Sequence, residues 1–151
     1  MILNDRIQIN RPPAQVWHYL QSPGRMKEWN SKIRAIVPVS WGEPTEGYRY
    51  RVRYRTTGGE NNFLAEFLEY QNEAKLIIHL SGGDLPLKGY IQEAYELTEH
   101  KKGTLLRRRI EMHNSAVSIF SRCLIILRHY VFGIFSRDKN LRSLKELIES
   151  S

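Results

Sequence analysis

The sequence predicts an α+β fold, in which a curved antiparallel sheet of about six or seven strands wraps around one long C-terminal helix. Three observations predict it: a helical segment near Ala14 to Gln21, strand-patterned sequence up to His113, and one helical pattern from Ser115 to Glu149. Two short helices are expected after the first strand. A sheet that curls around a single helix tends to leave a hollow, and we expect the functional site there.

The length and composition fit one domain that spans residues 1-151. A chain of 151 residues with 41% hydrophobic composition can bury an independent core. The lone cysteine, Cys123, cannot form an internal disulfide, which suits a reducing compartment, and it fits a small core residue better than a nucleophile. The segment from Met1 to Asn10 lacks an apolar stretch of signal-peptide length, so we expect a cytoplasmic protein.

The chain is basic, with a formal net charge of +7 and a pI near 9.7, and arginine supplies most of the positive charge. Such a charge attracts acidic partners without specifying which, so anionic lipid, nucleic acid and small acids all remain open. The simpler alternative is a solvated basic surface that keeps the protein dissolved.

The N-terminal elements follow from turn residues and apolar spacing. Residues Ile2 to Ile9 alternate partly and indicate a first strand, after which prolines stop strand pairing and favour the first turn of a helix. A break at Ser22-Pro23-Gly24 separates that helix from a short second one. The first helix presents Val16, Trp17 and Leu20 on one face, the second carries Met26 and Trp29, and a strand is expected over Ile33 to Val39.

The segment from Tyr48 to Arg55 carries the sharpest local signal. Strict alternation places tyrosines and one valine on one face of the sheet and arginines on the other. The two sets are Tyr48, Tyr50, Val52 and Tyr54, and Arg49, Arg51, Arg53 and Arg55. We expect the tyrosines to face the hollow. Because alternation separates the rings from the charges, the strand does not suit nucleic-acid binding.

The remaining strands are expected in two pairs. Turns at Thr57 to Glu60 and at Gln71 to Glu73 flank a strand over Phe63 to Tyr70, and Lys75 to Leu80 follows. In these two strands the odd-numbered and the even-numbered positions both mix apolar and charged residues, so the sequence does not assign their faces. After a loop at Ser81 to Asp84, the last hairpin joins Leu87 to Leu97 with Thr104 to His113 around Glu99 to Gly103.

A register for that hairpin follows if Leu97 pairs with Thr104. Glu93 then opposes Arg108, and the pair stands within an otherwise apolar face. The same register pairs Tyr95 with Leu106, Ile91 with Ile110 and Gly89 with Met112. An inward arginine is costly unless it is paired or bound to a ligand, so three alternatives remain: a pair that satisfies itself, a bulge that turns Arg108 outward, or a ligand anchor.

The C-terminal helical pattern is apolar nearly all round from Cys123 to Phe135. That stretch is too short to span a bilayer, and its second face could be covered by loops, by a homodimer partner or by an anionic membrane surface. After Gly133 a single apolar stripe returns, with Lys145 and Glu149 on the exposed side. The stripe consists of Leu141, Leu144 and Ile148.

Several segments resemble the START-like, or Bet v1-like, superfamily (SRPBCC), especially its polyketide cyclase/dehydrase and lipid-transport branch. They are Ile9 to Leu20, Ser22-Pro23, Glu28 to Ile33, Gly103-Thr104 and Leu144 to Glu149, and together they cover nearly the whole chain. The resemblance implies a helix-grip fold. One departure is Gln21-Ser22-Pro23, where an Asp-Pro is common, and it touches a helix end. The family includes carriers of lipids, sterols, quinones or hormones, cyclases, and chaperone-associated or ribosome-associated members, so the fold alone does not fix the function.

The leading hypothesis is a protein that binds a hydrophobic small molecule, a lipid, quinone or polyketide-like aromatic, between the sheet and the C-terminal helix. Such a site needs an apolar hollow and a few orienting polar groups. The predicted lining residues are Tyr48, Tyr50, Tyr54, Glu93, Tyr95, Leu106, Arg108, Ile110 and Met112.

The alternatives are a cyclase or dehydratase and a protein-interaction module at a membrane or ribosome. An enzyme would need an acid or base in the hollow. The weak candidates are Glu93 and Tyr95, followed by Glu66, Tyr50, Tyr54, His79 and His113. The histidines lack a local pattern such as two on one helical turn, and a single cysteine gives no zinc signature, so no metal site and no cofactor are expected.

Overall fold

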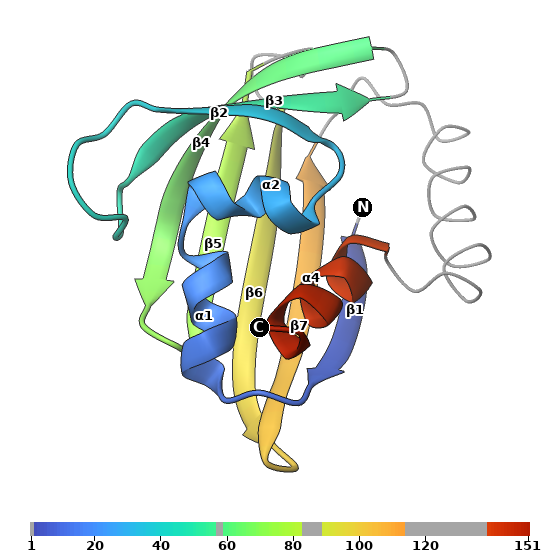
Figure 1. Cartoon of the computed structure of the whole chain (residues 1–151). Helices are drawn as coiled ribbons and strands as arrows, with labels where there is room; N and C mark the ends of the chain where they lie inside the picture. The colour runs from blue at the N-terminus through green and yellow to red at the C-terminus, as the bar shows by residue number, and fades with distance from the viewer. Residues whose placement is uncertain (1, 57–58, 83–88, 114–138) are drawn as a thin grey trace.

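The computed structural model of the chain describes residues 2–56, 59–82, 89–113 and 139–151 (Figure 1). The elements confirm the predicted fold class. In chain order they are β1 (Ile2–Ile9), α1 (Pro13–Leu20), the 3-10 helix η1 (Pro23–Arg25), α2 (Met26–Trp29), β2 (Ile33–Pro38), β3 (Arg49–Thr56), β4 (Gly59–Gln71), β5 (Lys75–Ser81), β6 (Tyr90–His100), β7 (Gly103–His113) and α4 (Lys139–Glu149).

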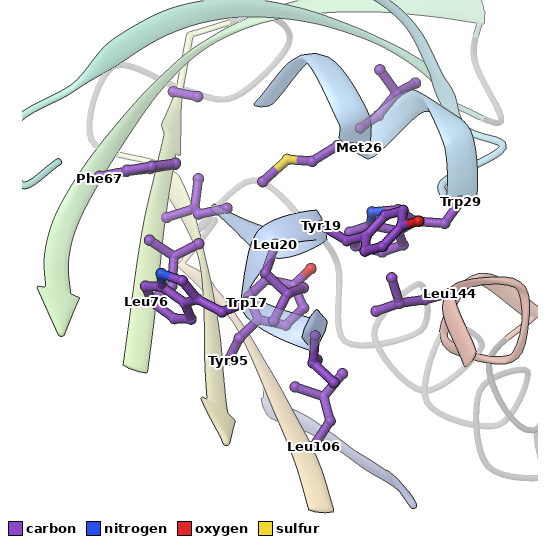
Figure 2. Close-up of a cluster of buried hydrophobic side chains, with 14 of the residues drawn as sticks. Trp17, Tyr19, Leu20, Met26, Trp29, Phe67, Leu76, Tyr95, Leu106 and Leu144 are labelled. Carbon is purple, nitrogen blue, oxygen red and sulfur yellow. The ribbon is translucent and has the colours of Figure 1, made fainter. Parts of the chain in front are cut away.

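The strands form one seven-stranded antiparallel sheet in the order β1-β7-β6-β5-β4-β3-β2. The first strand therefore lies beside the last, and β1 and β2 form the two edges. The helices α1, α2 and α4 cover one face, which we call the inner face, and the opposite side is the outer face (Figure 1). The core lies between the helices and the inner face, as Figure 2 shows for Trp17, Phe67 and Leu144.

The short helices form where the sequence analysis expects them. Pro12 and Pro13 supply the extended cap and first turn of α1, and Gln21 ends it with an N–H to the carbonyl of Trp17. The apolar face of α1 is buried, and Trp17 packs edge-on against Tyr70 of β4 with ring centroids 5.2 Å apart. These contacts hold the helix pair over one end of the sheet.

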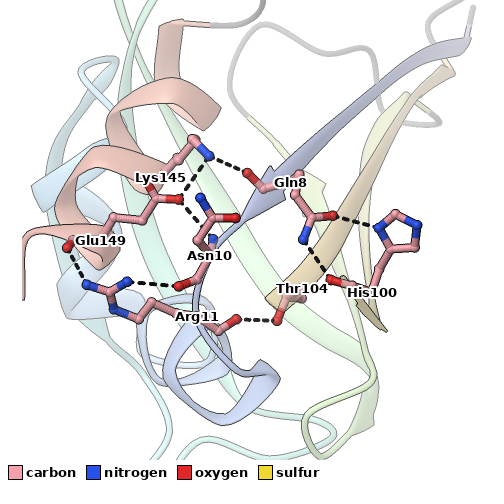
Figure 3. A network of polar contacts seen from close by, with 7 residues as sticks. All are labelled: Gln8, Asn10, Arg11, His100, Thr104, Lys145 and Glu149. Atoms are coloured by element: carbon pink, nitrogen blue, oxygen red, sulfur yellow. Dashed lines mark hydrogen bonds and ion pairs between the residues drawn. The ribbon is translucent and has the colours of Figure 1, made fainter. Parts of the chain in front are cut away.

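The C-terminal helix α4 is fastened to the start of the chain. Its stripe of Leu141, Leu144 and Ile148 is buried, as predicted. Lys145 Nζ lies 2.9 Å from Glu149 Oε1, and the same carboxylate accepts the backbone N–H of Asn10 at 2.9 Å (Figure 3). Arg11 Nη2 donates to the carbonyl of Glu149 at 2.6 Å. The expected i,i+4 pair is therefore confirmed, and it also joins α4 to the connection between β1 and α1.

Gly103 and Thr104, part of the motif that carried the resemblance, lie where β7 approaches β1 most closely. A Cβ on Gly103 would stand 2.3 Å from the carbonyl oxygen of Ile9, so no larger residue fits without movement of the backbone. The buried hydroxyl of Thr104 donates to the carbonyl of Arg11 at 2.8 Å (Figure 3).

The predicted register of the last hairpin is wrong by two residues. Lys101 and Lys102 adopt positive φ values of 50° and 61°, typical of a two-residue type I′ turn, and His100 pairs directly with Gly103. The observed partners are Leu97 with Leu106, Tyr95 with Arg108, Glu93 with Ile110 and Ile91 with Met112. Because the slip is even, every side chain keeps its predicted face.

A bulge explains the mixed parity of β4. Phe63, Ala65 and Phe67 lie on the inner face, but the register shifts between Phe67 and Glu69. Beyond the bulge Tyr70 opposes Leu76 and returns to the inner side. The inner residues of β4 are therefore odd-numbered before the bulge and even-numbered after it.

Some sequence predictions fall outside the described residues. These are the helical pattern from Ser115 up to residue 138, the apolar stretch Cys123 to Phe135, and parts of the turns at Thr57 to Glu60 and Ser81 to Asp84. In the part of the chain that the structure describes, no helix has both the length and the apolar character needed to cross a membrane.

Candidate functional site

The tyrosines in and directly before β3 line the inner face; Tyr48 precedes the strand, and Tyr50 and Tyr54 lie within it. Tyr48 and Tyr50 are buried and Tyr54 is half-buried, whereas the alternate arginines are exposed on the outer face. The alternation predicted for this strand is therefore confirmed. The rings of Tyr48 and Tyr50 lie 5.9 Å and 6.0 Å from the ring of Phe67 on β4, so the wall at this point is aromatic.

Tyr95 and Glu93, both on β6, form a polar pair within this apolar surface. The Tyr95 hydroxyl donates to Glu93 Oε2 at 2.7 Å. The Tyr95 side chain is buried and lies edge-on to Trp29 of α2, with ring centroids 6.3 Å apart. Glu93 is half-buried. The pair places one carboxylate and one phenol beneath the helices.

The phenols of this region are held in the protonated state. Burial raises the pKa of Tyr50, Tyr54 and Tyr95 well above its ordinary value, and the negative charge of Glu93 raises it further. At neutral pH the three hydroxyls are therefore hydrogen-bond donors rather than bases.

Arg108 lies on the inner face, but its acidic partner is on β1. Its Nη2 lies 2.7 Å from Asp5 Oδ2, and the two side chains are only 5% and 17% exposed. Asp5 directly opposes Arg108 in the β1–β7 ladder. The predicted cross-strand pair of Arg108 with Glu93 is wrong, because the hairpin register sets Glu93 against Ile110. The alternative of an outward-turned Arg108 is wrong as well, because its side chain is buried.

The other predicted lining residues share this face. Leu106 is fully buried, while Ile110 and Met112 are half-buried. The sheet thus brings the predicted set together across β3, β6 and β7. Sequence reasoning missed Asp5 and Phe67. The odd-numbered alternation of β1 could have placed Asp5 inward, but its pairing with β7 is a long-range contact.

Three weaker acid or base candidates lie on the wrong side of the sheet. Glu66 on the outer face is 3.6 Å from Arg49 Nε. His79 packs at a tilt against Tyr90, with ring centroids 5.0 Å apart. Tyr90 stacks in turn on His113, and His113 contacts Glu111 at 2.6 Å. Alternation places all three opposite the inner-face residues, so they cannot serve a site under the helices.

The outer face carries an open hollow of about 510 Å³ that sequence reasoning did not predict. Ala94 leaves space among longer side chains of β1, β6 and β7. The outer-face residues that line it are Asn4, Arg6, Ala94, Glu96, Arg107 and Arg109. Asp5 and Arg108, whose side chains lie on the inner face, alternate with them along β1 and β7 and also border the hollow. The described residues contain no group of three histidine, cysteine or acidic side chains that could hold a metal ion.

Comparisons with known proteins agree with this arrangement. The profile of the family described as polyketide cyclase / dehydrase and lipid transport matches residues 2–149. The fold is similar to that of Ara h 8.0201, with 11% identity, a TM-score of 0.70 and coverage of 100% of this chain and 99% of that one. A comparison with proteins of curated function finds no match.

Two bacterial structures are similar over comparable lengths. TTHA0849 from Thermus thermophilus has 16% identity and a TM-score of 0.73, with 99% of this chain and 98% of that chain covered. A START superfamily protein from Mycobacterium smegmatis has 12% identity and a TM-score of 0.73, with 99% and 97% covered. At such identities these likenesses establish the fold alone.

Proposed function

The chain belongs to the polyketide cyclase/dehydrase and lipid transport family, and we propose that it binds a hydrophobic small molecule between the inner face of the sheet and the C-terminal helix. The ligand classes that fit are a lipid, a quinone or a polyketide-like aromatic. Members of this family generally bind hydrophobic ligands, and this chain matches the family over nearly its whole length.

The observation that carries the proposal is the small set of polar groups on an otherwise apolar inner face. Tyr50 and Tyr54 are protonated donors, and Glu93 with Tyr95 forms a polar pair next to them. A ligand site of this kind needs an apolar wall for affinity and a few donors or acceptors for orientation. A carbonyl or hydroxyl on the ligand would suit the phenol donors.

The direct test is native mass spectrometry of the protein as purified from cells, followed by organic extraction of anything bound. A co-purified lipid, quinone or aromatic supports the proposal. A ligand-free mass that persists after incubation with a panel of such compounds contradicts it and indicates a filled core.

Variants locate the site. Ile110→Trp adds bulk to the half-buried inner face and is expected to abolish binding by filling the space. Arg53→Ala on the outer face of β3 is the matched control and should bind as the native protein does. Equal loss in both variants would place the ligand elsewhere.

The alternative function is a cyclase or dehydratase, and the Tyr95–Glu93 hydrogen bond favours it. Glu93 could accept a proton from a bound substrate, while Tyr95, which donates its hydroxyl proton to Glu93 Oε2, would hold that carboxylate in place. Glu93→Gln preserves the shape of the side chain and separates the two functions. Binding should survive this substitution in either case. An enzyme would lose turnover, whereas a carrier shows no turnover in the native protein or in the variant.

A further inference from the structure

Trp41 is the most exposed large side chain among the described apolar residues, at 97%. The other two tryptophans, Trp17 and Trp29, are only 3% and 2% exposed. A tryptophan placed wholly in water leaves a large apolar ring without a partner, which is unusual for a residue of this size.

Hydrogen bonds hold the segment that carries Trp41, which connects β2 to β3. At its start, Ser40 N–H donates to the carbonyl of Arg49 at 3.0 Å, and Ser40 Oγ accepts the N–H of Arg49 at 2.8 Å. At its end, Gly47 N–H donates to the carbonyl of Phe67 at 2.8 Å. Because both ends are tied to the sheet, the exposure of Trp41 is a feature of the fold.

Further exposed apolar side chains precede Trp41 in the sequence at the same edge of the sheet. Val37 lies on β2 and Val39 just beyond its end, and both side chains are exposed. Val37 directly opposes Arg51 of β3, and Val39 N–H donates to the carbonyl of Arg49. We call Val37, Val39, Trp41, Arg49 and Arg51 the β2 edge patch. It combines an apolar row with an adjacent cationic row.

Strand pairing with a second copy does not suit the segment from residue 38 to residue 40. Pro38 has no N–H, and the N–H groups of Val39 and Ser40 both bond to Arg49. The backbone from residue 38 to residue 40 therefore has no donor for another strand. At these three residues a partner must instead contact the side chains.

We propose that the β2 edge patch docks the protein on a phospholipid surface, with Trp41 in the headgroup region and Arg51 against lipid phosphates. Tryptophan is enriched at membrane interfaces, and guanidinium groups match phosphate geometry. In the described residues Arg51 makes no ion pair, whereas Arg49 is 3.6 Å from Glu66.

Two acidic residues moderate the charge of the patch. Glu43 and Glu46 lie in the same connection and are exposed. They oppose a strongly anionic membrane, so the tryptophan and the valines supply most of the affinity for phosphatidylcholine, and the arginines add affinity when phosphatidylserine is present. The protein is therefore expected to bind vesicles of phosphatidylcholine, and to bind more tightly when phosphatidylserine is mixed in.

The docking does not depend on the ligand proposed above. It is tested with vesicles and protein alone, so its failure would leave ligand binding intact, and a ligand-free protein could still dock.

Tryptophan fluorescence of the full chain with these vesicles is the direct measurement. Because Trp17 and Trp29 are buried, a blue shift on vesicle addition, and quenching by brominated lipid, report on Trp41. Trp41→Ala should remove the shift and lower vesicle co-sedimentation about tenfold or more. Arg51→Glu should lower co-sedimentation with phosphatidylserine vesicles about 25-fold, since each charge near such a surface contributes about fivefold.

The matched control is Ile2→Ala, which removes another exposed apolar side chain from the opposite edge strand and should bind normally. Near-ultraviolet circular dichroism from the buried aromatic rings checks that each variant is folded. The proposal is overturned if the native protein does not sediment with either vesicle, or if Trp41→Ala sediments as the native protein does. A blue shift that grows with protein concentration without vesicles would also overturn it, because a second copy would then cover the patch.

Discussion

Asp5 and Arg108 oppose each other directly across the β1–β7 ladder and form a 2.7 Å ion pair on the inner face of the sheet. The pair joins the first strand to the last, which are separated by most of the chain. Burial of two charges is costly by itself, and their attraction offsets the cost only while both are present. The pairing of edge strand β1 with β7 is therefore expected to weaken when either residue is replaced.

Asp5→Asn should destabilise the protein by about 3 kcal/mol, because it leaves the buried Arg108 charge without its Asp5 partner. Urea unfolding followed by circular dichroism measures the change. The double variant Asp5→Leu with Arg108→Met, which replaces both charges by apolar groups, should recover most of the loss. The single variants Asp5→Leu and Arg108→Met complete the comparison. If the loss of unfolding free energy in the double variant equals the sum of the losses in these two, the coupling between the two residues is absent.

Gly103→Ala should destabilise the protein by about 1–3 kcal/mol, because the added methyl group meets the carbonyl oxygen of Ile9 at 2.3 Å and forces β1 away from β7. Thermal unfolding measures the loss. Gly24→Ala is the matched control, since a Cβ at Gly24 meets nothing within 4 Å. Equal stability of the two variants would contradict the close approach.

The order of the elements and the faces of the residues on β3, β6 and β7 could be predicted from the sequence, because both depend on local periodicity. The strand from Tyr48 to Arg55 is the clearest case, since its alternation alone assigned all eight side chains to a face. Turn residues placed the two short helices by the same local logic.

Partners across strands could not be predicted in the same way. The hairpin register depended on Lys101 and Lys102 adopting positive φ, a conformation that lysine rarely takes. The bulge after Phe67 reversed the parity of β4, and no residue type in the sequence marks it. Asp5 became the partner of Arg108 only because β1 pairs with β7, and this pairing joins residues that are far apart in the sequence.

Glu149→Gln should weaken the attachment of α4 at neutral pH and flatten the acid dependence of stability. The hydrogen bond from Asn10 N–H, followed by Lys145, lowers the pKa of Glu149 below its ordinary value of 4.5. A lowered pKa in the folded state stabilises it fully above pH 4.5, and this contribution is lost as the pH falls through the folded-state pKa.

Urea unfolding at neutral and acidic pH tests this dependence. The difference in unfolding free energy between native protein and Glu149→Gln should shrink as the pH falls. Glu146→Gln, an exposed change on the same helix, is the control and should show no such convergence. A pH-independent difference for Glu149→Gln would mean that the carboxylate charge does not hold α4.

The three phenols on the inner face, Tyr50, Tyr54 and Tyr95, predict a loss of stability in alkali. The pKa of Tyr50, Tyr54 and Tyr95 is raised above the ordinary 10.0 in the folded state, so above pH 10 the unfolded chain releases protons that the folded chain keeps. Stability therefore falls as the pH rises through 10, by up to about 1.4 kcal/mol per pH unit for each phenol. Absorbance titration should show these phenols ionising only together with unfolding.

Tyr95→Phe isolates one of the three phenols. It removes a titrating group, so the alkaline decline of unfolding free energy should become shallower by about 1.4 kcal/mol per pH unit. It also removes the 2.7 Å hydrogen bond to Glu93, which should cost about 1 kcal/mol at neutral pH. The two effects have opposite signs in alkali, so the stability curves of variant and native protein should converge and cross above pH 10. Parallel curves would show that Tyr95 ionises in the folded protein as readily as in the unfolded chain, and that its burial does not hold the proton.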